Sequence, residues 1–217
     1  MTHVHRIPPP ADLEGRRAAV VVIDVQNDYC HADGAFAGAG LTLADLDGLV
    51  TSINRLTSAA RAAGHPVIWV RMVWDTDEDP GILGRRSPFM AGALRRGSWG
   101  AEPVDGLDVE PGDHVVEKRR FSAFHETALE DLLRAEGVTT LVAAGVRTDF
   151  CVESTVRDAM FRDLEVLVPR ETVAGYVAEL HEHSLRLMDT VFAWVLPLEQ
   201  VLALMTHSPA HHPPQEV

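Results

Sequence analysis

The feature that most constrains this fold is a run of six apolar residues, Ala18 to Ile23, that ends at Asp24. The run is far too short to cross a membrane, and apolar and polar residues do not alternate along it. An uninterrupted apolar strand needs cover on both faces, which is typical of parallel sheets flanked by helices. The run therefore predicts a central strand with Asp24 at its carboxyl end, where open α/β sheets place their ligands. The alternative role for Asp24 is to cap the following turn.

Further short apolar segments alternate with segments of helical pattern. Strands are expected over 67–70, 113–117, 139–144, 165–168 and 193–196. Helices are expected over about 46–64 and 127–137, from Cys151 onward, and over about 180–192. This alternation predicts a mostly parallel sheet with helices on both faces. No G-x-G-x-x-G sequence follows a strand, so a dinucleotide fingerprint is missing.

Composition limits the class of protein. A chain of 217 residues, 46% of them hydrophobic, can bury one sizeable core, which predicts a single domain over 1–217. The net charge of -13 argues against nucleic acid or an anionic membrane as partner. Cys30 and Cys151 have neither disulfide-framework nor zinc spacing, and no signal sequence is apparent, so a cytoplasmic protein is expected. Residues 207–217, rich in His and Pro, are expected to form a flexible tail rather than a metal site.

The richest stretch for chemistry runs from Gly145 to Met160, where a buried strand stops at a glycine and a helix is expected to begin at Cys151. The free N–H groups and dipole of a helix N-terminus lower a thiol pKa, so Cys151 is a candidate nucleophile. The alternative is a small buried core cysteine. Lys118, at the end of another expected strand, is the only lysine in the chain. A single lysine in a chain whose other basic residues are arginines indicates that this position needs a compact ammonium group. The alternative is that one lysine is present by chance.

Residues 72–112 form a long loop rich in Gly, Pro, Arg and Trp, and such loops are commonly functional. Its aromatic residues, with Trp74 as the first, would either wall a pocket or pin the loop to the body.

Asp24, Lys118 and Cys151, with the residues around them, resemble the catalytic triad of the isochorismatase-like cysteine hydrolases. The matching stretches are Val22-Ile23-Asp24-Val25-Gln26-Asn27-Asp28-Tyr29-Cys30, the run 118–124, and the run 145–159. The resemblance covers about 18–196. It implies a Rossmann-like three-layer sandwich with a six-stranded sheet, no cofactor, a homodimer or homotetramer, and a cis peptide at Val146-Arg147.

The resemblance also implies a mechanism, in which Asp24 takes the proton of Cys151 and Lys118 stabilises the charges. The backbone N–H groups of Arg147 and Cys151 would form the oxyanion hole. Asp24 would then protonate the departing ammonia or amine and activate water against the thioester. Substrate-binding residues are expected among Gln26, Phe36, Arg71, Trp74 and Phe150, and a substrate carboxylate is expected to meet one or two of Arg71, Arg85, Arg86, Arg95 and Arg96.

Differences between this sequence and some members of the family limit the reactions that are expected. Nicotinamidase-like members carry a metal-binding Asp-x-His pattern after the second strand, whereas the matching segment 70–77 holds no histidine, so no metal is expected. True isochorismatases lack the nucleophilic cysteine, so Cys151 favours amide chemistry. The run 151–158 is most similar to hydrolases of ureido and carbamoyl compounds. The expected activity is hydrolysis of a small linear amide or ureido substrate. A vinyl-ether hydrolase and a catalytically silent binding module remain alternatives.

Overall fold

A computed structural model describes residues 9–10 and 16–206. The predicted flexible tail, 207–217, lies outside the described residues. The strands are β1 (Ala18–Ile23), β2 (Val67–Met72), β3 (His114–Lys118), β4 (Thr140–Val146), β5 (Glu165–Pro169), β6 (Val173–Ala174) and β7 (Trp194–Leu196). The helices are α1 (Asn27–Cys30), α2 (Ala35–Gly38), α3 (Leu46–Ala62), α4 (Ile82–Arg86), α5 (Leu129–Ala135), α6 (Glu153–Met160), α7 (Ala178–Val191) and α8 (Leu198–Thr206).

Every strand pairing in the sheet is parallel, and the order is β3-β2-β1-β4-β5-β7, with β6 paired beside β4. The sheet thus has seven strands rather than the six expected. The extra strand, β6, contains only two residues, too few to show an apolar pattern. All six residues of β1 and all seven of β4 are buried, as expected for central strands covered on both faces.

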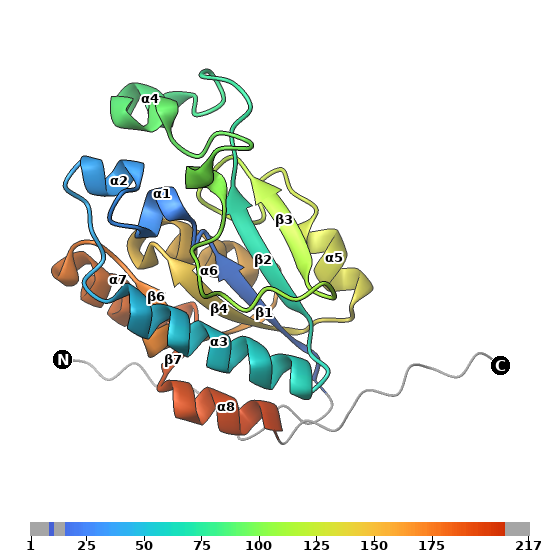
Figure 1. The fold of residues 1–217 in the computed structure, drawn as a ribbon. Helices are drawn as coiled ribbons and strands as arrows, with labels where there is room; N and C mark the ends of the chain where they lie inside the picture. The colour runs from blue at the N-terminus through green and yellow to red at the C-terminus, as the bar shows by residue number, and fades with distance from the viewer. Residues whose placement is uncertain (1–8, 11–15, 207–217) are drawn as a thin grey trace.

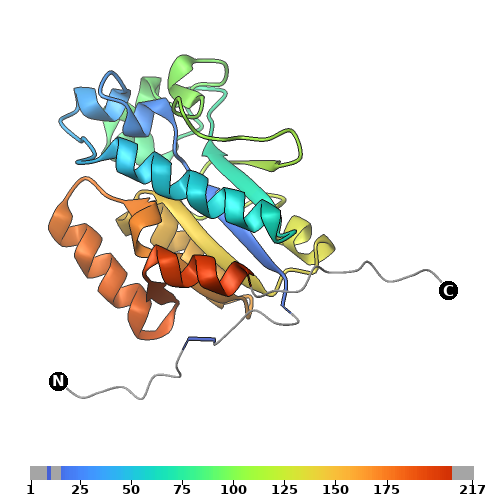
Figure 2. The same cartoon turned by 60° about the horizontal axis from the view of Figure 1, so that its bottom comes forward.

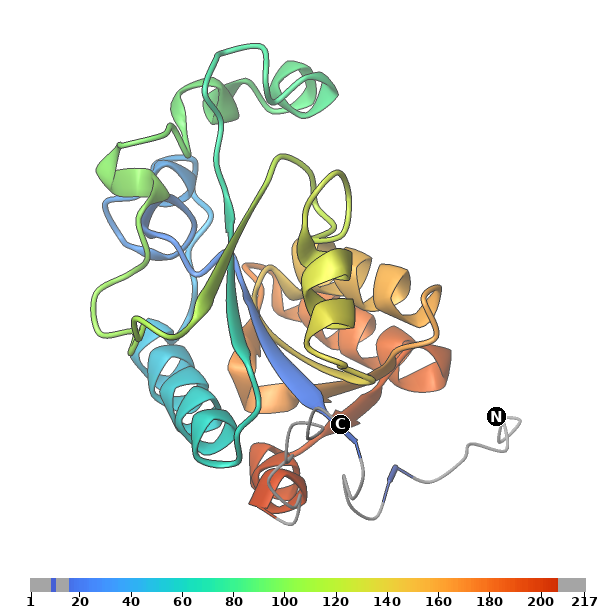
Figure 3. The same cartoon turned by 90° about the vertical axis from the view of Figure 1, so that its right-hand side faces the viewer.

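Helices cover both faces of the sheet and make a three-layer sandwich (Figure 3). Helices α3 and α8 pack together on one face and run across the strands (Figure 2). Helices α5, α6 and α7 lie on the other face (Figure 3). Helix α1, helix α2 and the segment around α4 gather beyond one end of the strands (Figure 1). No helix of the described residues is long and apolar enough to cross a membrane.

Helix α3 illustrates how local sequence sets an element. The Asp45 carboxylate accepts a hydrogen bond from the backbone N–H of Gly48 at 2.8 Å and caps the first turn. Leu49, Ile53 and Leu56 follow at helical spacing and are buried against the sheet, and each contributes roughly 1.5–3 kcal/mol by leaving water.

Gly145 lets β4 and β1 approach closely enough to bring the ends of both strands together. It pairs with Ile23 and has a φ of +108°. A Cβ at this position would lie 2.0 Å from the carbonyl oxygen of Ile23, closer than any side chain can tolerate. Only glycine fits here, and the residues that follow the two strands become neighbours.

The long loop between β2 and β3 is anchored to the body by Asp28. One carboxylate oxygen accepts from the backbone N–H of Leu94 at 2.6 Å, and the other accepts from that of Ala35 at 3.1 Å. Trp74 is fully buried, and its indole N–H points to the carbonyl oxygen of Arg119 at 3.4 Å. Of the two roles expected for Trp74, the structure therefore favours pinning the loop.

Candidate active site

Asp24, Lys118 and Cys151 come from three different strand ends and meet below the protein surface. Lys118 Nζ lies 2.7 Å from Asp24 Oδ2 and donates to Cys151 Sγ at 3.4 Å and to the carbonyl oxygen of Arg120 at 2.9 Å. Asp24 and Lys118 are at most 1% exposed and Cys151 is 2% exposed. The structure therefore places the three predicted side chains in one buried cluster.

The backbone holds Asp24 in an uncommon conformation. Its φ is +55°, in the left-handed region that residues other than glycine seldom adopt. Its N–H donates to the carbonyl oxygen of Val70 at 2.8 Å, and its own carbonyl accepts from the N–H of Gln26 at the same distance. Non-glycine residues held in this region concentrate at functional sites.

Cys151 lies in a π-helical turn, Thr148–Val152, that leads into α6. The helix expected to begin at Cys151 therefore begins two residues later, at Glu153. The Cys151 carbonyl accepts from the Thr155 hydroxyl at 2.7 Å, which ties the turn to the helix. The peptide bond between Val146 and Arg147 is cis, as the resemblance implied.

The expected lowering of the thiol pKa is wrong for the resting site. Burial raises the pKa of Cys151; the Lys118 ammonium opposes this rise, and the Asp24 carboxylate adds to it. Burial likewise raises the pKa of Asp24, and Lys118 offsets only part of that. For Lys118, burial alone would lower the pKa, but the charges of Asp24 and Cys151 outweigh it and the pKa is raised. The single positive charge of Lys118 thus faces two acidic groups. The cluster is neutral when Asp24 and Cys151 hold one proton between them, because one negative charge then remains.

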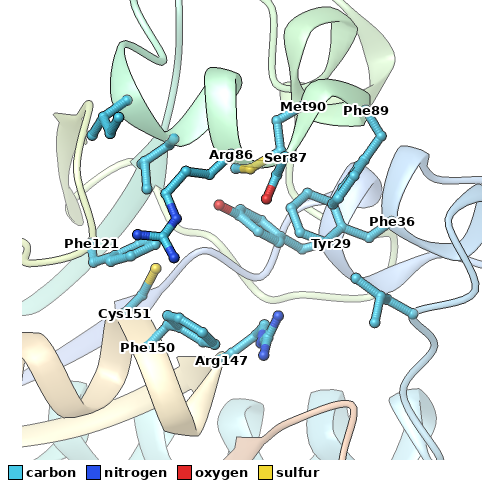
Figure 4. Close-up of a pocket in the computed structure, with 13 residues that line it drawn as sticks. Tyr29, Phe36, Arg86, Ser87, Phe89, Met90, Phe121, Arg147, Phe150 and Cys151 are labelled. Atoms are coloured by element: carbon cyan, nitrogen blue, oxygen red, sulfur yellow. The ribbon is translucent and has the colours of Figure 1, made fainter.

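Cys151 lines a cavity of about 630 Å3, shown in Figure 4. The wall is mainly apolar, its polar members are few, and no carboxylate contributes to it. Such a wall is typical of sites for small molecules. The lining residues are Tyr29, Phe36, Leu41, Ile82, Leu83, Arg86, Ser87, Phe89, Met90, Phe121, Arg147, Phe150 and Cys151.

Phe36 and Phe150 are the two predicted substrate-binding residues that line this cavity. Trp74 is not part of the wall, because its side chain is packed inside the protein. Gln26 is buried and uses its amide to bond the backbone, donating to Met72 O at 2.9 Å and Ala101 O at 2.8 Å and accepting from Met72 N at 2.9 Å. Arg71 lies outside the wall and pairs with Glu117 at 2.8 Å.

Arg86 is the one of the five predicted arginines that lines the cavity. Among the described residues, no carboxylate lies within 4.0 Å of its guanidinium. Arg95 and Arg96 pair with acidic residues of the loop instead, and Arg85 is exposed outside the wall.

Several lining residues were not recognised from sequence, and Arg147 and Tyr29 are two of them. The Arg147 side chain was not expected in the wall, and it is held by Asp149 at 2.7 Å and stacked between the rings of Phe150 and Tyr176. Tyr29 is the other. The signal for it was its place in the stretch after Asp24, where the chain turns at the end of a central strand.

No group of three or more His, Cys, Asp or Glu side chains among residues 9–10 and 16–206 is arranged to hold a metal ion.

Comparison with known proteins finds relatives along nearly the whole chain. The ureidoacrylate amidohydrolase RutB of Methylobacterium radiotolerans is 36% identical over 222 residues, which span 94% of this chain and 86% of the relative. A cysteine hydrolase from Pseudomonas syringae pv. phaseolicola superposes with a TM-score of 0.81 at 28% identity, covering 88% of this chain and 92% of that one. The N-carbamoylsarcosine amidase of Thermoplasma acidophilum superposes with a TM-score of 0.67 at 27% identity, covering 84% and 97%.

The match to the family itself is equally extended. Residues 18–200 match the isochorismatase domain, a span that begins at β1, ends inside α8 and contains Asp24, Lys118 and Cys151. The chain therefore belongs to the isochorismatase family.

Proposed function

We propose that this protein hydrolyses the terminal C–N bond of a small linear ureido acid, with Cys151 as nucleophile, and releases ammonia. The protein is an amide-cleaving hydrolase of its family. The observation that carries the proposal is the buried cluster in which one ammonium contacts both the Asp24 carboxylate and the Cys151 sulfur at the bottom of an apolar cavity. A nucleophile, an adjacent base and a charged group that orients both are the requirements of covalent catalysis.

The proposed reaction has two stages. The Cys151 thiol gives its proton to Asp24, and the thiolate forms a bond to the substrate carbonyl carbon. The carbonyl oxygen becomes an oxyanion, held by the backbone N–H groups of Arg147 and Cys151. The C–N bond then breaks as Asp24 returns its proton to the nitrogen, and ammonia leaves a thioester behind. Water attacks the thioester, Asp24 takes a water proton, and the Cys151 thiol is restored as the acid product departs.

The acid group of the substrate is assigned to Arg86. The cavity wall has two arginines and no carboxylate, in a chain of net charge -13. Asp149 already neutralises Arg147, whereas no carboxylate of the described residues neutralises Arg86. A guanidinium without a counter-ion binds a carboxylate well, in a bidentate pair. The names of the relatives, ureidoacrylate amidohydrolase and N-carbamoylsarcosine amidase, support a ureido or carbamoyl acid.

Three further parts of the proposal come from the sequence. The reaction needs no metal, since segment 70–77 lacks histidine. The protein is cytoplasmic, in keeping with two cysteines that are both free thiols, and it forms a homodimer or homotetramer. Size-exclusion chromatography with light scattering tests the assembly.

The decisive experiment is a screen of ureido acids and primary amides with ammonia detection. Cys151→Ala should lose all turnover, while Cys30→Ala, at the other buried cysteine, should remain active. Activity should survive exhaustive chelation. Equal activity in wild type and Cys151→Ala, or turnover of isochorismate and of no amide, would overturn the proposal. Absence of turnover with every compound would favour the silent binding module.

A matched pair of variants tests the assignment of Arg86. Arg86→Gln should raise KM for a ureido acid by about tenfold or more, because a charged hydrogen bond is lost. Arg85→Gln removes the neighbouring, exposed arginine outside the cavity and should leave KM unchanged. Equal effects of the two substitutions would contradict a specific role for Arg86.

A further inference from the structure

The hydrogen-bonding balance of the cavity points to a role for Tyr29. A terminal amide or ureido –NH2 group carries two N–H donors, and buried donors need acceptors. Among the polar side chains of the wall, Arg86 and Arg147 only donate. The hydroxyl oxygens of Tyr29 and Ser87 can accept. An acceptor near the nucleophile is therefore scarce in this cavity.

The Tyr29 ring is held firmly in place. It is 4% exposed and packs against Phe36 with ring centroids 4.4 Å apart. Its backbone carbonyl accepts from the Tyr176 hydroxyl at 2.7 Å, and its N–H donates to the carbonyl of Gln26 at 3.1 Å. A fixed ring gives the hydroxyl a defined position, which discrimination between similar substrates requires.

The hydroxyl itself is oriented with its oxygen available. It donates to the thioether sulfur of Met72 at 3.2 Å, so the proton is directed at Met72 and the lone pairs remain open. Figure 4 shows the hydroxyl end of Tyr29 directed into the cavity whose wall includes Cys151 and Ser87. Burial, with additions from the nearby Cys151 and Asp24, raises the pKa of Tyr29 well above its ordinary value. The group therefore stays a neutral hydroxyl at any working pH.

The second N–H of an –NH2 group has a natural partner in Asp24. The carboxylate contacts Lys118 through Oδ2 and is hydrogen-bonded by the Cys151 side chain, and its remaining lone pairs can accept an N–H. In the proposed reaction, the proton that reaches the departing nitrogen comes from this same carboxylate. One N–H directed at Asp24 leaves the other in need of an acceptor.

We infer that the Tyr29 hydroxyl oxygen accepts the second N–H of the leaving –NH2 group, so that the enzyme selects unsubstituted terminal amides over N-alkyl amides. The inference rests on the proposed function and deepens it, because it makes ammonia, not an alkylamine, the preferred leaving group. A methyl group in place of that hydrogen would face an oxygen lone pair that it cannot satisfy.

The test compares kcat/KM for matched pairs of ureido acids that end in –NH2 or –NHCH3. Tyr29→Phe keeps the ring and removes only the oxygen. It should lower kcat/KM for the –NH2 compound about tenfold, as expected for one hydrogen bond, and leave the –NHCH3 compound unchanged or faster. Thr57→Val is the control. It removes another buried hydroxyl, one that donates to the carbonyl of Asn54 within α3 and lies outside the cavity wall, and it should keep the wild-type ratio.

The outcomes separate this inference from the proposed function. An unchanged ratio in an active Tyr29→Phe enzyme would overturn the inference alone, as would a loss of selectivity in Ser87→Ala but not in Tyr29→Phe. A wild type that hydrolyses neither compound would overturn the proposed function and the inference with it. Calorimetry with Cys151→Ala, and with Cys151→Ala combined with Tyr29→Phe, measures the same preference in binding, without turnover.

Discussion

Replacing Lys118 by arginine tests whether any positive charge in the site is sufficient, or whether the charge must lie at the position of the Lys118 ammonium. Lys118 Nζ has three partners: Asp24 Oδ2 at 2.7 Å, Arg120 O at 2.9 Å and Cys151 Sγ at 3.4 Å. An ammonium has three N–H donors that diverge from one atom, whereas the donors of a guanidinium lie in one plane. Lys118→Arg keeps the charge but cannot reproduce these three directions.

The size of the effect follows from the distances. With an effective dielectric constant of about 20, unit charges separated by the 3.4 Å between Nζ and Sγ interact by about 5 kcal/mol. Each 1.4 kcal/mol or so corresponds to a factor of ten, so Lys118→Met should cost up to about three to four powers of ten in activity. Lys118→Met also leaves a buried carboxylate unpaired, which destabilises the fold by roughly 3–5 kcal/mol. Lys118→Arg misplaces the charge by about 1 Å and should lose roughly a hundredfold in activity.

The assay combines kcat/KM with the rate of Cys151 alkylation by iodoacetamide, measured in a Cys30→Ala background so that one thiol reacts. Thermal unfolding of each variant separates loss of fold from loss of chemistry. Arg119→Met is the matched control, because this neighbouring cation is 55% exposed and pairs with Asp75 outside the cluster. The control should change activity less than about twofold. Wild-type alkylation and turnover in a folded Lys118→Arg protein would refute the geometric argument, and wild-type values in Lys118→Met would refute the electrostatic one.

Three other predictions concern pH and the fold. Burial raises the pKa of Asp24, so kcat/KM should fall as the pH is lowered, with a midpoint above 3.8. At that midpoint Asp24 gains a proton and can no longer accept one from Cys151. A midpoint at or below 3.8 would contradict this. Burial raises the pKa of Asp113, but hydrogen bonds from Arg61 and Trp69 outweigh it and the pKa is lowered. Asp113→Asn should therefore cost roughly 1–3 kcal/mol in urea unfolding at neutral pH, and the difference should shrink as the pH falls below 3.8; a pH-independent difference would contradict the linkage. Gly145→Ala should destabilise the protein by about 3 kcal/mol or more, while Gly112→Ala, where no atom lies within 4 Å of an added Cβ, should be nearly neutral in thermal unfolding.

The parallel sheet was predictable from sequence because its signal is local. The apolar runs of β1 and β4 have no polar positions, so their burial on both faces follows from composition alone. Strand β6 was not predictable, because two residues carry no pattern and their pairing with β4 depends on the chain that precedes them. The start of α6 was placed two residues early, because the π-helical turn before it satisfies its backbone without a recognisable cap.

The lining of the cavity was predictable only in part. Phe36 and Phe150 were identified, but Trp74 was placed on the wall although it is fully buried. The same type of aromatic residue in a long loop can either pack into the core or face a ligand. Which of the two occurs depends on the space that other elements leave. For the same reason, sequence could not distinguish Arg86 from the four other arginines in or near the loop, whose surroundings are set by the fold.

By itself, the sequence determined which chemical groups stand at the ends of the central strands, because parallel strands deliver their carboxyl ends to one edge of the sheet. A carboxylate, an ammonium and a thiol at that edge follow from the positions of Asp24, Lys118 and Cys151. The tertiary structure alone decided how these groups influence one another. A helix N-terminus predicts a lowered thiol pKa, but the pKa of Cys151 is raised because burial removes water from the thiolate and Asp24 places a second acid beside it. Desolvation and the effect of nearby charges depend on distances through space, and these distances cannot be read from the spacing of residues along the sequence.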